Sequence, residues 1–532
     1  MNISLRFILL YLLSVVALFS SCEKKWDDHT ELSNSLYGES LFDQIQKNPD
    51  LSKFVDLLKQ TKYDSVLASS NTFTVWAPTN AAIDAVDPTY LDSDVKRKLF
   101  VGNHISKQSY LTYGAADPFT KIKVMNGKNV QFTKTAVDGI TLLSKDLYVG
   151  NGTLHTIGSA ILPKPNAWEY LLSTNTTQKA LLNSYTETYL DSSKAEQIGV
   201  RPNTGEPIFK EGTGIVMRNR FLNRYSQASD ISNEDSLFTY IILTDQAFIN
   251  EKNKLSKYFK LGTDDSTSVL TDFNIIKDLA FKGILDADNF PANVYSIGDS
   301  VRFHLNKGHI VETKRVSNGI VYVMNNINYD LGSGTYDPYT KIKPIVIEGE
   351  RGAFFSPART FNTVTKRNPN GSSYQQLYLS NHGVNALAAR YRPSFVNSVK
   401  YKVYWRVVRD FNLSVTGTAT NLVHFPMRLA FKTSALTTGF NYIPEPGVVR
   451  RTNSTGQPVL DVNGKPTFDP DYSEVYLGEF TADKVFANRT EVGDLKDKEA
   501  SMLPIFLVGN TTTGNGTNTL LLDYIKLVPV LP

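Results

Sequence analysis

The chain has 532 residues, with 56 Lys and Arg against 52 Asp and Glu and a single cysteine. With 41% hydrophobic and 20% charged residues, its composition is that of a globular protein and excludes a long disordered, collagen-like or coiled-coil chain. One cysteine excludes an intrachain disulfide framework, an iron–sulfur cluster and a cysteine-based zinc site, and the small positive charge gives no electrostatic footprint for nucleic acid. The length corresponds to about three or four domains.

Residues 1–21 have the composition of an export signal. A short start with one positive charge leads into an apolar stretch at residues 7–19, and two serines then precede Cys22. This stretch is shorter than the roughly 20 residues that span a bilayer as a helix. Residues 19–22 resemble the box of a bacterial lipoprotein signal, which implies that acyl chains such as palmitate anchor the mature chain at Cys22. An ordinary signal peptide with an incidental cysteine is the alternative.

Residues 22–37 follow as a charged tether. Asp27 and Asp28 lie close behind Cys22 and resemble the acidic surface-export signal of Bacteroidetes lipoproteins. A solvated linker that carries no signal would tolerate the same charges. We favour the export signal and expect a lipid-anchored protein of the outer membrane that faces the cell exterior.

Residues 38–165 are expected to form helices first and strands later. Apolar residues recur at mostly three- and four-residue spacing over 41–67, which predicts helical structure, and Pro49 divides it into two helices. Residues 72–76 alternate as a strand, and Asn80 is placed to cap the helix that follows.

Another helix and several short strands complete this region. An amphipathic helix is predicted at residues 92–101, and residues 103–105 have the pattern of a strand. Short strands cover 122–143, turned at the Asn-Gly pair 126–127, and residues 152–157 form a closing strand. Helices followed by strands with tight turns predict an α+β architecture.

The order of these motifs resembles a fasciclin domain. Residues 73–82, 126–128 and 151–163 match the family's first signature, its Asn-Gly hairpin and its closing signature. Asn103 and His104 fall where the family has a Tyr-His pair, with asparagine in place of tyrosine. The resemblance implies adhesion or protein contact, in general terms only, because a fold does not fix a function.

The neighbourhood of His104 is where some fasciclin relatives contact their partners. The resemblance therefore makes Asn103, His104 and Ile105 candidate partner contacts. From the residues alone, His104 and His155 are better explained as buried side chains whose hydrogen bonds fix the core. Both interpretations are kept at this point.

The same order of motifs returns in weaker form over residues 166–347. An apolar helical pattern at 168–189 precedes a strand at 238–243, and residues 275–284 resemble the helix and strand before the family's hairpins. Residues 318–323 repeat the closing Asn-Gly pattern. We therefore predict a second, divergent fasciclin-like domain.

Two features distinguish this second copy. Phe281 and Lys282 stand at the position of the Tyr-His pair, so only the first copy would retain part of any function located there. Residues 201–230 are an insertion with several arginines, which we predict to be a long surface loop.

Residues 348–532 have a different sequence pattern, in which short alternating strands lie between Gly, Asn and Pro turns. This pattern predicts a β-sandwich of the jelly-roll type, and the final strand, 520–530, resembles the last strand of carbohydrate-binding jelly rolls. The predicted fold class is α+β, with two tandem fasciclin-like α+β domains followed by an all-β sandwich. The clearest strands are 401–408, 425–431, 474–480, 504–508 and 519–528.

The sequence carries no recognisable catalytic set. It has no Gly-x-Ser-x-Gly elbow, no phosphate-binding Gly-rich loop and no cysteine nucleophile, and its seven histidines lack the spacing of a zinc protease helix. His304 and His309 are assigned to hairpin positions in preference to metal ligation. We therefore expect a protein that is not an enzyme and that needs no cofactor and no metal.

Residues 461–464 allow two interpretations. Asp461, Asn463 and a glycine turn supply the kind of ligands that a calcium loop uses, but Tyr472 stands where such a loop needs its glutamate. Asn-Gly between extended segments is also the strongest short hairpin signal. We favour the hairpin.

Two surface chemistries remain as candidates. Tyr404 and Trp405 could stack on sugar rings, but neighbouring residues of a strand point to opposite faces, so at most one of them is exposed. Asp-Ser pairs resemble Bacteroidetes O-glycosylation acceptors, with ordinary turns or helix caps as the alternative. The four candidate serines are Ser65, Ser236, Ser266 and Ser300.

Two functions follow from these predictions. The leading one is a non-enzymatic surface lipoprotein whose fasciclin domains mediate protein–protein contact or cell adhesion, with another surface protein or an outer-membrane complex as partner. The alternative is a glycan-binding accessory lipoprotein that captures polysaccharide through the C-terminal sandwich, beside a polysaccharide-uptake system. No nucleic-acid partner is expected.

Overall fold

The structure is a computed structural model that describes residues 38–222, 230–409, 426–432, 447–464, 466–488, 501–511 and 518–531. Cys22, Asp27 and Asp28 lie outside the described residues. The chain divides into two compact units. The first unit contains the residues up to Tyr170 together with Ser232–Leu237 and Arg315–Gly319. The second unit contains Leu171–Ile231, Phe238–Lys314 and Ile320–Pro532.

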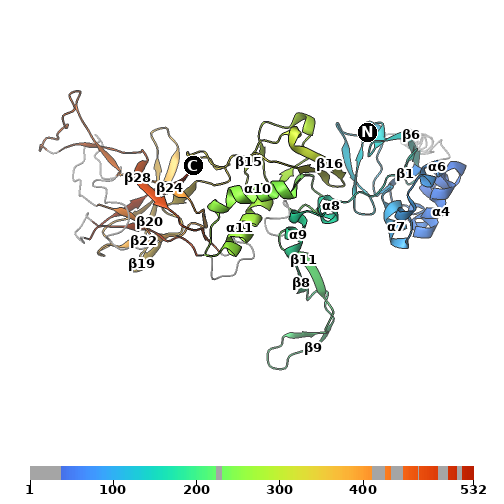
Figure 1. The fold of residues 1–532 in the computed structure, drawn as a ribbon, viewed down its shortest axis with the longest axis horizontal. Helices are drawn as coiled ribbons and strands as arrows, with labels where there is room; N and C mark the ends of the chain where they lie inside the picture. The colour runs from blue at the N-terminus through green and yellow to red at the C-terminus, as the bar shows by residue number, and fades with distance from the viewer. Residues whose placement is uncertain are drawn as a thin grey trace, which may run out of the picture. The chain divides into compact units, whose positions relative to one another are not determined.

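The first unit combines short helices with one seven-stranded sheet, in the order β2-β1-β7-β6-β5-β4-β3 (Figure 1). Its helices are α3 (Leu41–Gln46), α4 (Ser52–Thr61), α5 (Tyr63–Leu67), α6 (Asn80–Asp84) and α7 (Asp94–Gly102). Its strands are β1 (Phe73–Pro78), β2 (Ile105–Ser106), β3 (Thr120–Lys123), β4 (Asn129–Phe132), β5 (Ala136–Val137), β6 (Ile140–Val149) and β7 (Gly152–Ile157).

Strand β1 is the centre of this unit. It is buried along its whole length and pairs in parallel with β7, so that Phe73 faces Gly152 and Trp76 faces His155. The helices bury their apolar side chains, such as Phe54 and Leu58, in a cluster that includes Val75 of β1. A second cluster contains Trp76 and Phe132. Both faces of β1 are covered, so the whole strand is buried, including the polar Thr74.

The predicted elements of this unit are largely confirmed, with three local corrections. Residues 41–67 form three α-helices and not two, because a second break at Lys62, which has a left-handed φ of 61°, separates α4 from α5. The predicted strand at residues 103–105 is wrong in its first half, because Asn103 is the C-cap of α7 and only Ile105 enters β2. Asn80 does not cap α6; the side chain of Thr79 accepts the N–H of Ala82 in that role. The Asn80 side chain instead accepts the N–H of Lys53 at 2.9 Å.

The second unit begins with a region of helices and a four-stranded sheet, in the order β13-β12-β17-β16. The helices are α8 (Ala167–Ser173), which starts in the first unit, α9 (Thr177–Ser184), α10 (Asp245–Leu255) and α11 (Asp264–Ile276). The strands are β12 (Phe238–Leu243), β13 (Ala280–Lys282), β14 (Val294–Tyr295), β15 (Arg302–Phe303), β16 (Ile310–Val316) and β17 (Gly319–Met324), of which the end of β16 and the first residue of β17 belong to the first unit. This strand order repeats that of β2-β1-β7-β6.

The assignment of His304 and His309 to a hairpin is wrong. The two residues lie in the connection between β15 and β16, which belong to different sheets, and His309 ends a short 3-10 turn. The side chain of Asn306 caps this turn by accepting the N–H of Gly308 at 2.8 Å.

The insertion predicted as a loop at 201–230 is a β-ribbon where it is described. Strand β8 (Thr186–Leu190) pairs with β11 (Ile215–Asn219), and beyond them β9 (Gln197–Val200) pairs with β10 (Pro207–Phe209). The ribbon leads away from α9 and α11 and ends in the β9–β10 hairpin (Figure 1). We call residues 186–219 the ribbon.

The C-terminal part of the second unit is all β. One sheet has the order β18-β32-β24-β28, a second β19-β22-β30-β25 and a third β20-β21-β31. The strands are β18 (Ile345–Glu348), β19 (Phe354–Ser356), β20 (Asn362–Arg367), β21 (Ser373–Leu379), β22 (Ala388–Tyr391), β23 (Phe395–Val396), β24 (Lys400–Arg406), β25 (Arg428–Phe431), β26 (Val448–Arg450), β27 (Phe468–Pro470), β28 (Val475–Thr481), β29 (Phe486–Ala487), β30 (Ile505–Val508), β31 (Leu520–Leu522) and β32 (Tyr524–Val530).

This part confirms the predicted sandwich and the turn within it. Along β24, Tyr401, Val403 and Trp405 are buried, so the sheet has one face in the core. At residues 461–464 the N–H of Gly464 donates to the carbonyl of Asp461, and β26 and β27 pair on either side. The hairpin interpretation is therefore confirmed. Across the described ranges, no helix is both long and apolar enough to span a membrane.

Candidate functional site

His104, predicted as a buried hydrogen-bonding residue, occupies the core of the first unit beside the C-terminal end of α7. Its Nδ1 donates to the carbonyl of Phe100 at 2.9 Å, and its Nε2 accepts the N–H of Ile161 at 2.9 Å. A backbone carbonyl can only accept and an amide can only donate, so the ring is neutral with its proton on Nδ1. Burial lowers the pKa of His104 to about 4, although the hydrogen bond to Phe100 acts to raise it.

His155 on β7 also forms hydrogen bonds with two backbone groups, but its proton is on Nε2 and not on Nδ1. Its Nδ1 accepts the N–H of Asp146 at 3.2 Å, and its Nε2 donates to the carbonyl of Tyr110 at 3.0 Å. Burial lowers the pKa of His155 as well. Both nitrogens of each ring therefore form hydrogen bonds with backbone groups. This confirms the prediction that the two histidines fix the core.

The candidate partner contacts around His104 need a correction. Asn103 and Ile105 are buried and His104 is 0% exposed, so none of the three side chains offers a surface to a partner. The Asn103 amide donates to the carbonyl of Ile161 at 2.9 Å and stays inside the unit. The partner-contact hypothesis at this motif is wrong, because a side chain that already satisfies its polar groups in the core has none left for a ligand.

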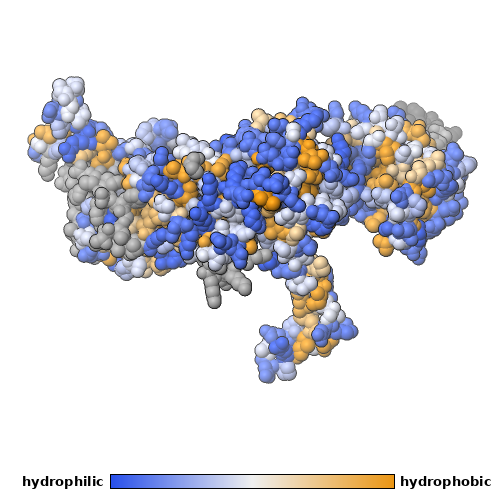
Figure 2. Space-filling view, in the orientation of Figure 1, coloured by the Kyte–Doolittle hydropathy of each residue, from blue (hydrophilic) through white to orange (hydrophobic). Residues whose placement is uncertain are grey.

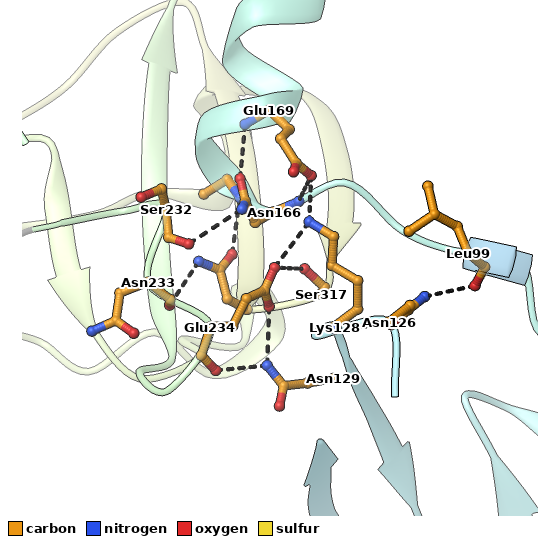
Figure 3. A network of polar contacts seen from close by, with 12 residues as sticks. Leu99, Asn126, Lys128, Asn129, Asn166, Glu169, Ser232, Asn233, Glu234 and Ser317 are labelled. Atoms are coloured by element: carbon orange, nitrogen blue, oxygen red, sulfur yellow. Dashed lines mark hydrogen bonds and ion pairs between the residues drawn. The ribbon is translucent and has the colours of Figure 1, made fainter. Parts of the chain in front are cut away.

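A polar network forms around the predicted Asn-Gly hairpin between β3 and β4 (Figure 3). The ammonium of Lys128 lies 3.0 Å from Glu234 Oε1 and 2.5 Å from Glu169 Oε2. Asn129 donates to the Glu234 carboxylate at 3.0 Å, and Ser317 donates to the same carboxylate at 2.8 Å. All of these residues belong to the first unit. Figure 3 shows the side chains converging on Glu234. The network therefore joins stretches of the first unit that are far apart in the sequence.

The ribbon presents apolar side chains to solvent. Met217 is 73% exposed and Ile215 is 55% exposed. Figure 2 shows hydrophobic residues gathered along the ribbon, where it leaves the rest of the second unit. The large apolar residues exposed on it are Tyr189, Leu190, Ile198, Val200, Ile208, Ile215 and Met217. Single exposed apolar residues need no explanation, but the neighbouring Leu190, Ile215 and Met217 make the ribbon a candidate interaction surface.

The two faces of the β8–β11 pair differ in chemistry. Leu190 is directly opposite Ile215, so the two share a face, and Met217 lies on that face two residues along. On the other face Arg218 pairs with Glu187 at 2.8 Å, and its guanidinium lies 4.6 Å from the ring centroid of Tyr189. The ribbon is therefore amphipathic, with an apolar face that no part of the described chain covers.

The base of the ribbon is fixed although its length is exposed. The amide of Asn219 donates to the carbonyl of Leu182 at 2.7 Å. The ring of Phe221 packs at 6.0 Å from that of Tyr185 and 6.2 Å from that of Phe273. An isolated two-stranded hairpin is marginally stable in water. The aromatic base compensates for this, and it holds the apolar face in a defined position.

The candidate glycan-stacking residues Tyr404 and Trp405 lie on opposite faces of β24, as strand alternation predicts. Trp405 is 1% exposed and lies in the sandwich core, so it cannot stack on a sugar, and its candidacy is wrong. Tyr404 lies on the opposite face, directly across from Tyr476, with the two ring centroids 5.3 Å apart. Tyr476 is 52% exposed, and the ammonium of Lys526 lies 5.2 Å from the ring of Tyr404. Two tyrosines and a lysine thus form a small polar-aromatic surface.

The candidate glycosylation serines are in different environments. Ser65 and Ser300 are exposed and Ser236 is half-buried, so these three remain predictions. Ser266 is buried in the first turn of α11, where its N–H donates to the Thr263 side chain at 3.1 Å. The Ser266 candidacy is wrong, because the capping turn leaves no room for a sugar transferase or its product.

The structure bears on the metal prediction within the described residues, but the predicted anchor lies outside them. Among the residues that the structure describes, no three or more His, Cys, Asp or Glu side chains are grouped to hold a metal ion. Cys22, Asp27 and Asp28 lie outside the described residues, so the lipid anchor and the export signal remain predictions from the sequence.

The sequence did not point to the ribbon as a functional surface. A signal was present, since Gly205, Gly212 and Gly214 all adopt positive φ values and mark the turns of the ribbon. The strands between these turns are short and carry apolar residues without a buried partner, and for that reason they resembled a loop.

Comparison with known proteins identifies one family. Residues 49–163 match the fasciclin domain model. No curated protein matches the sequence. This range includes the two buried histidines and the β1–β7 pair.

Several solved structures show a distant likeness. A fasciclin domain pair from the insect cell adhesion molecule Fasciclin I is 14% identical with a TM-score of 0.21, covering 53% of this chain and 97% of that chain. A C-terminal carbohydrate-binding module of family 6 from a Zobellia galactanivorans laminarinase is 12% identical with a TM-score of 0.15, covering 35% and 99%. A family 35 carbohydrate-binding module from Clostridium thermocellum is 14% identical with a TM-score of 0.17, covering 35% and 99%. At these TM-scores the likenesses support no inference about ligands. The family match to the sequence does stand, and the chain contains a fasciclin domain at residues 49–163.

Proposed function

We propose that this chain is a non-enzymatic, lipid-anchored protein of the outer-membrane surface that mediates protein–protein contact or adhesion, with the ribbon as its contact surface. The fasciclin domain at residues 49–163 supports a role in contact of this kind. The lipoprotein-like signal ending at Cys22 supports the anchor, and Asp27 with Asp28 supports exposure to the cell exterior. The observation that carries the proposal is the uncovered apolar face of the ribbon.

The proposal includes a second fasciclin-like domain over residues 166–347. Its sheet repeats the strand order of the first domain. An asparagine also recurs at the same place in each copy: Asn151 accepts the N–H of Leu41, the first residue of α3, at 2.7 Å. Asn318 accepts the N–H of Ala167, the first residue of α8, at 2.9 Å. A shared long-range hydrogen bond at matching positions favours a repeated domain over a chance likeness of pattern.

Loss of the apolar face should abolish partner binding without unfolding the chain. In the double variant Ile215→Thr with Met217→Thr, both changes keep a β-forming residue at exposed positions, so we expect stability to change by less than about 1 kcal/mol. We expect capture of the partner from outer-membrane extracts, identified by mass spectrometry, to fall at least about tenfold relative to the wild-type chain.

A matched control separates this effect from general surface change. Val311→Thr alters an exposed β-branched residue of β16, which is 60% exposed and lies outside the ribbon. It should capture the same proteins as the wild type. If the ribbon variant and the Val311 variant captured identical proteins in identical amounts, the ribbon would not be the contact surface.

A second candidate function is glycan binding by the C-terminal sandwich, favoured by the Tyr404–Tyr476 pair. Aromatic faces pack on the C–H faces of pyranose rings, whereas the ammonium of Lys526 beside them is already paired with Glu474. In affinity gels that contain polysaccharide, the full-length Tyr476→Ala variant should migrate faster than the wild type. The control Tyr336→Ala removes another tyrosine, 53% exposed, outside the sandwich. Equal migration of wild type and Tyr476→Ala on every polysaccharide would exclude this surface.

A further inference from the structure

A small pocket lies on the C-terminal sandwich, between the segment that joins β18 to β19 and the end of β22. Its volume is about 270 Å³, which suits a ligand smaller than a drug-sized molecule. The charged side chains of its lining are three arginines, and no carboxylate of the described residues lines it. The arginines are Arg351, Arg390 and Arg392, and the ring of Phe354 lies among them.

One of the three arginines already has acidic neighbours. The Nε of Arg351 lies 3.8 Å from Glu350 Oε1. Burial and Glu350 raise the pKa of the Glu348 carboxyl, and Arg351 acts to lower it. Glu348 also lines a neighbouring cavity together with Lys343, which balances its charge there. The charge of Arg351 is therefore committed to these carboxylates and is not counted as excess in the pocket.

Arg390 and Arg392 carry the excess charge of the pocket. Among the residues that the structure describes, neither guanidinium is paired with a carboxylate. Arginine stays protonated at every pH at which the chain is folded, so both charges are permanent. The two residues stand at the end of one strand and line the same pocket. The pocket therefore has an excess of two positive charges in a small volume.

An exposed aromatic ring restrains one of these arginines. Phe354 of β19 is directly opposite Arg390 of β22, so the two side chains share a face of the sheet. The guanidinium carbon of Arg390 lies 4.7 Å from the ring centroid of Phe354. This stacking holds the guanidinium in place before a ligand binds and so lowers the cost of ordering it. Phe354 is 57% exposed, so its ring still offers surface to an organic group.

We propose that this pocket binds a small phosphate monoester, whose phosphate pairs with Arg390 and Arg392 and whose organic part packs against Phe354. Guanidinium groups match phosphate oxygens through paired N–H bonds. A phosphate monoester carries about two negative charges near neutral pH and so balances the excess of the pocket, whereas a sulfate monoester carries one. The site is built on β19 and β22, so it does not depend on the ribbon or on the Tyr404–Tyr476 surface.

Isothermal titration calorimetry of the full chain in phosphate-free buffer tests the class of ligand. We expect glucose 6-phosphate and phenyl phosphate to bind at least about tenfold more tightly than the matching sulfate esters, because the sulfates carry one negative charge fewer. Inorganic phosphate should bind more weakly than the esters, since it has no organic part to contact Phe354. Binding of only one phosphate ester would support the proposal and define the organic part. Failure of both esters to bind, or equal binding of phosphate and sulfate esters, would overturn it.

Variants at exposed positions then locate the site. Arg392→Gln should weaken the binding of the phosphate ester about tenfold or more, and the exposed position means that the chain should fold normally. Phe354→Ala should reduce the affinity for the ester to that for inorganic phosphate. Arg367→Gln, at an exposed arginine of β20 that does not line the pocket, should bind like the wild type. Unchanged binding in Arg392→Gln, or equal losses in Arg392→Gln and Arg367→Gln, would contradict the site.

Discussion

Acidification from pH 7 to pH 4 is expected to remove about 3 kcal/mol of stability from the fasciclin domain through His104 alone. The unfolded chain binds a proton on this ring near the ordinary histidine pKa of 6.5, whereas the folded ring binds it only at about 4. Between these values the unfolded state holds more protons, so stability is fully present above pH 6.5 and is lost as the pH falls through this window. Because burial also lowers the pKa of His155, that residue adds to the loss with the same sign.

The geometry explains why the folded ring resists the proton. The only ring nitrogen of His104 without a proton is Nε2, and it accepts the N–H of Ile161. A proton there would face another donor in a fully buried site, which is costly.

Urea titrations at several pH values, each read by hydrogen-exchange pulse labelling of peptides from β1 and β7, would measure this dependence. The variant His104→Gln should be less stable at neutral pH but should lose most of the pH dependence that His104 causes. His304→Gln, at a histidine of the second unit, should leave the acid loss of the fasciclin domain unchanged. An acid loss of the same size in wild type and His104→Gln would refute the assignment.

Gly152→Ala is expected to destabilise the fasciclin domain by about 3–5 kcal/mol. Gly152 has a φ of +146°, and a Cβ at this position would lie 1.9 Å from the carbonyl oxygen of Phe73 on β1. The clash is with backbone of the central strand, so no side-chain movement can relieve it. The β1–β7 pairing would have to open at its first register position.

Gly127→Ala provides the control for backbone strain alone. Gly127 also has a positive φ, +87°, but a Cβ there would meet nothing within 4 Å. Its cost should be about 1 kcal/mol. Hydrogen exchange of peptides that contain β1 should show much larger loss of protection for Gly152→Ala than for Gly127→Ala, and similar losses for both would mean that the close approach to Phe73 is not what requires glycine.

Local patterns in the sequence predicted much of the fold. The strand β1, the Asn-Gly turn before β4 and the opposite faces of Tyr404 and Trp405 depend on residues that are near one another in the chain, and all were found as predicted, although β1 is buried on both faces and does not alternate in burial. The error at residues 103–105 arose because Asn103 could end a helix as easily as begin a strand, and its side chain decides the matter only through a contact with Ile161.

The proposed contact surface was harder to predict, because it depends on which residues the rest of the fold leaves uncovered. The ribbon strands have ordinary β-forming residues, but only the fold reveals that Leu190 and Ile215 share an uncovered face. The convergence of Lys128 and Ser317 on Glu234 joins residues far apart in the chain, so no local pattern could indicate it. His104 and Trp405 were excluded as contact residues because both side chains are buried.

The proposed contact between the apolar face of the ribbon and another protein can be captured covalently. A photo-crosslinking amino acid is placed at Met217 of the full-length chain, with the same group at Val311 as the reference position. We expect a discrete protein adduct from position 217 that is absent from position 311 and that disappears when Ile215 is replaced by threonine. No adduct from position 217, or the same adducts in the same yield from both positions, would contradict it.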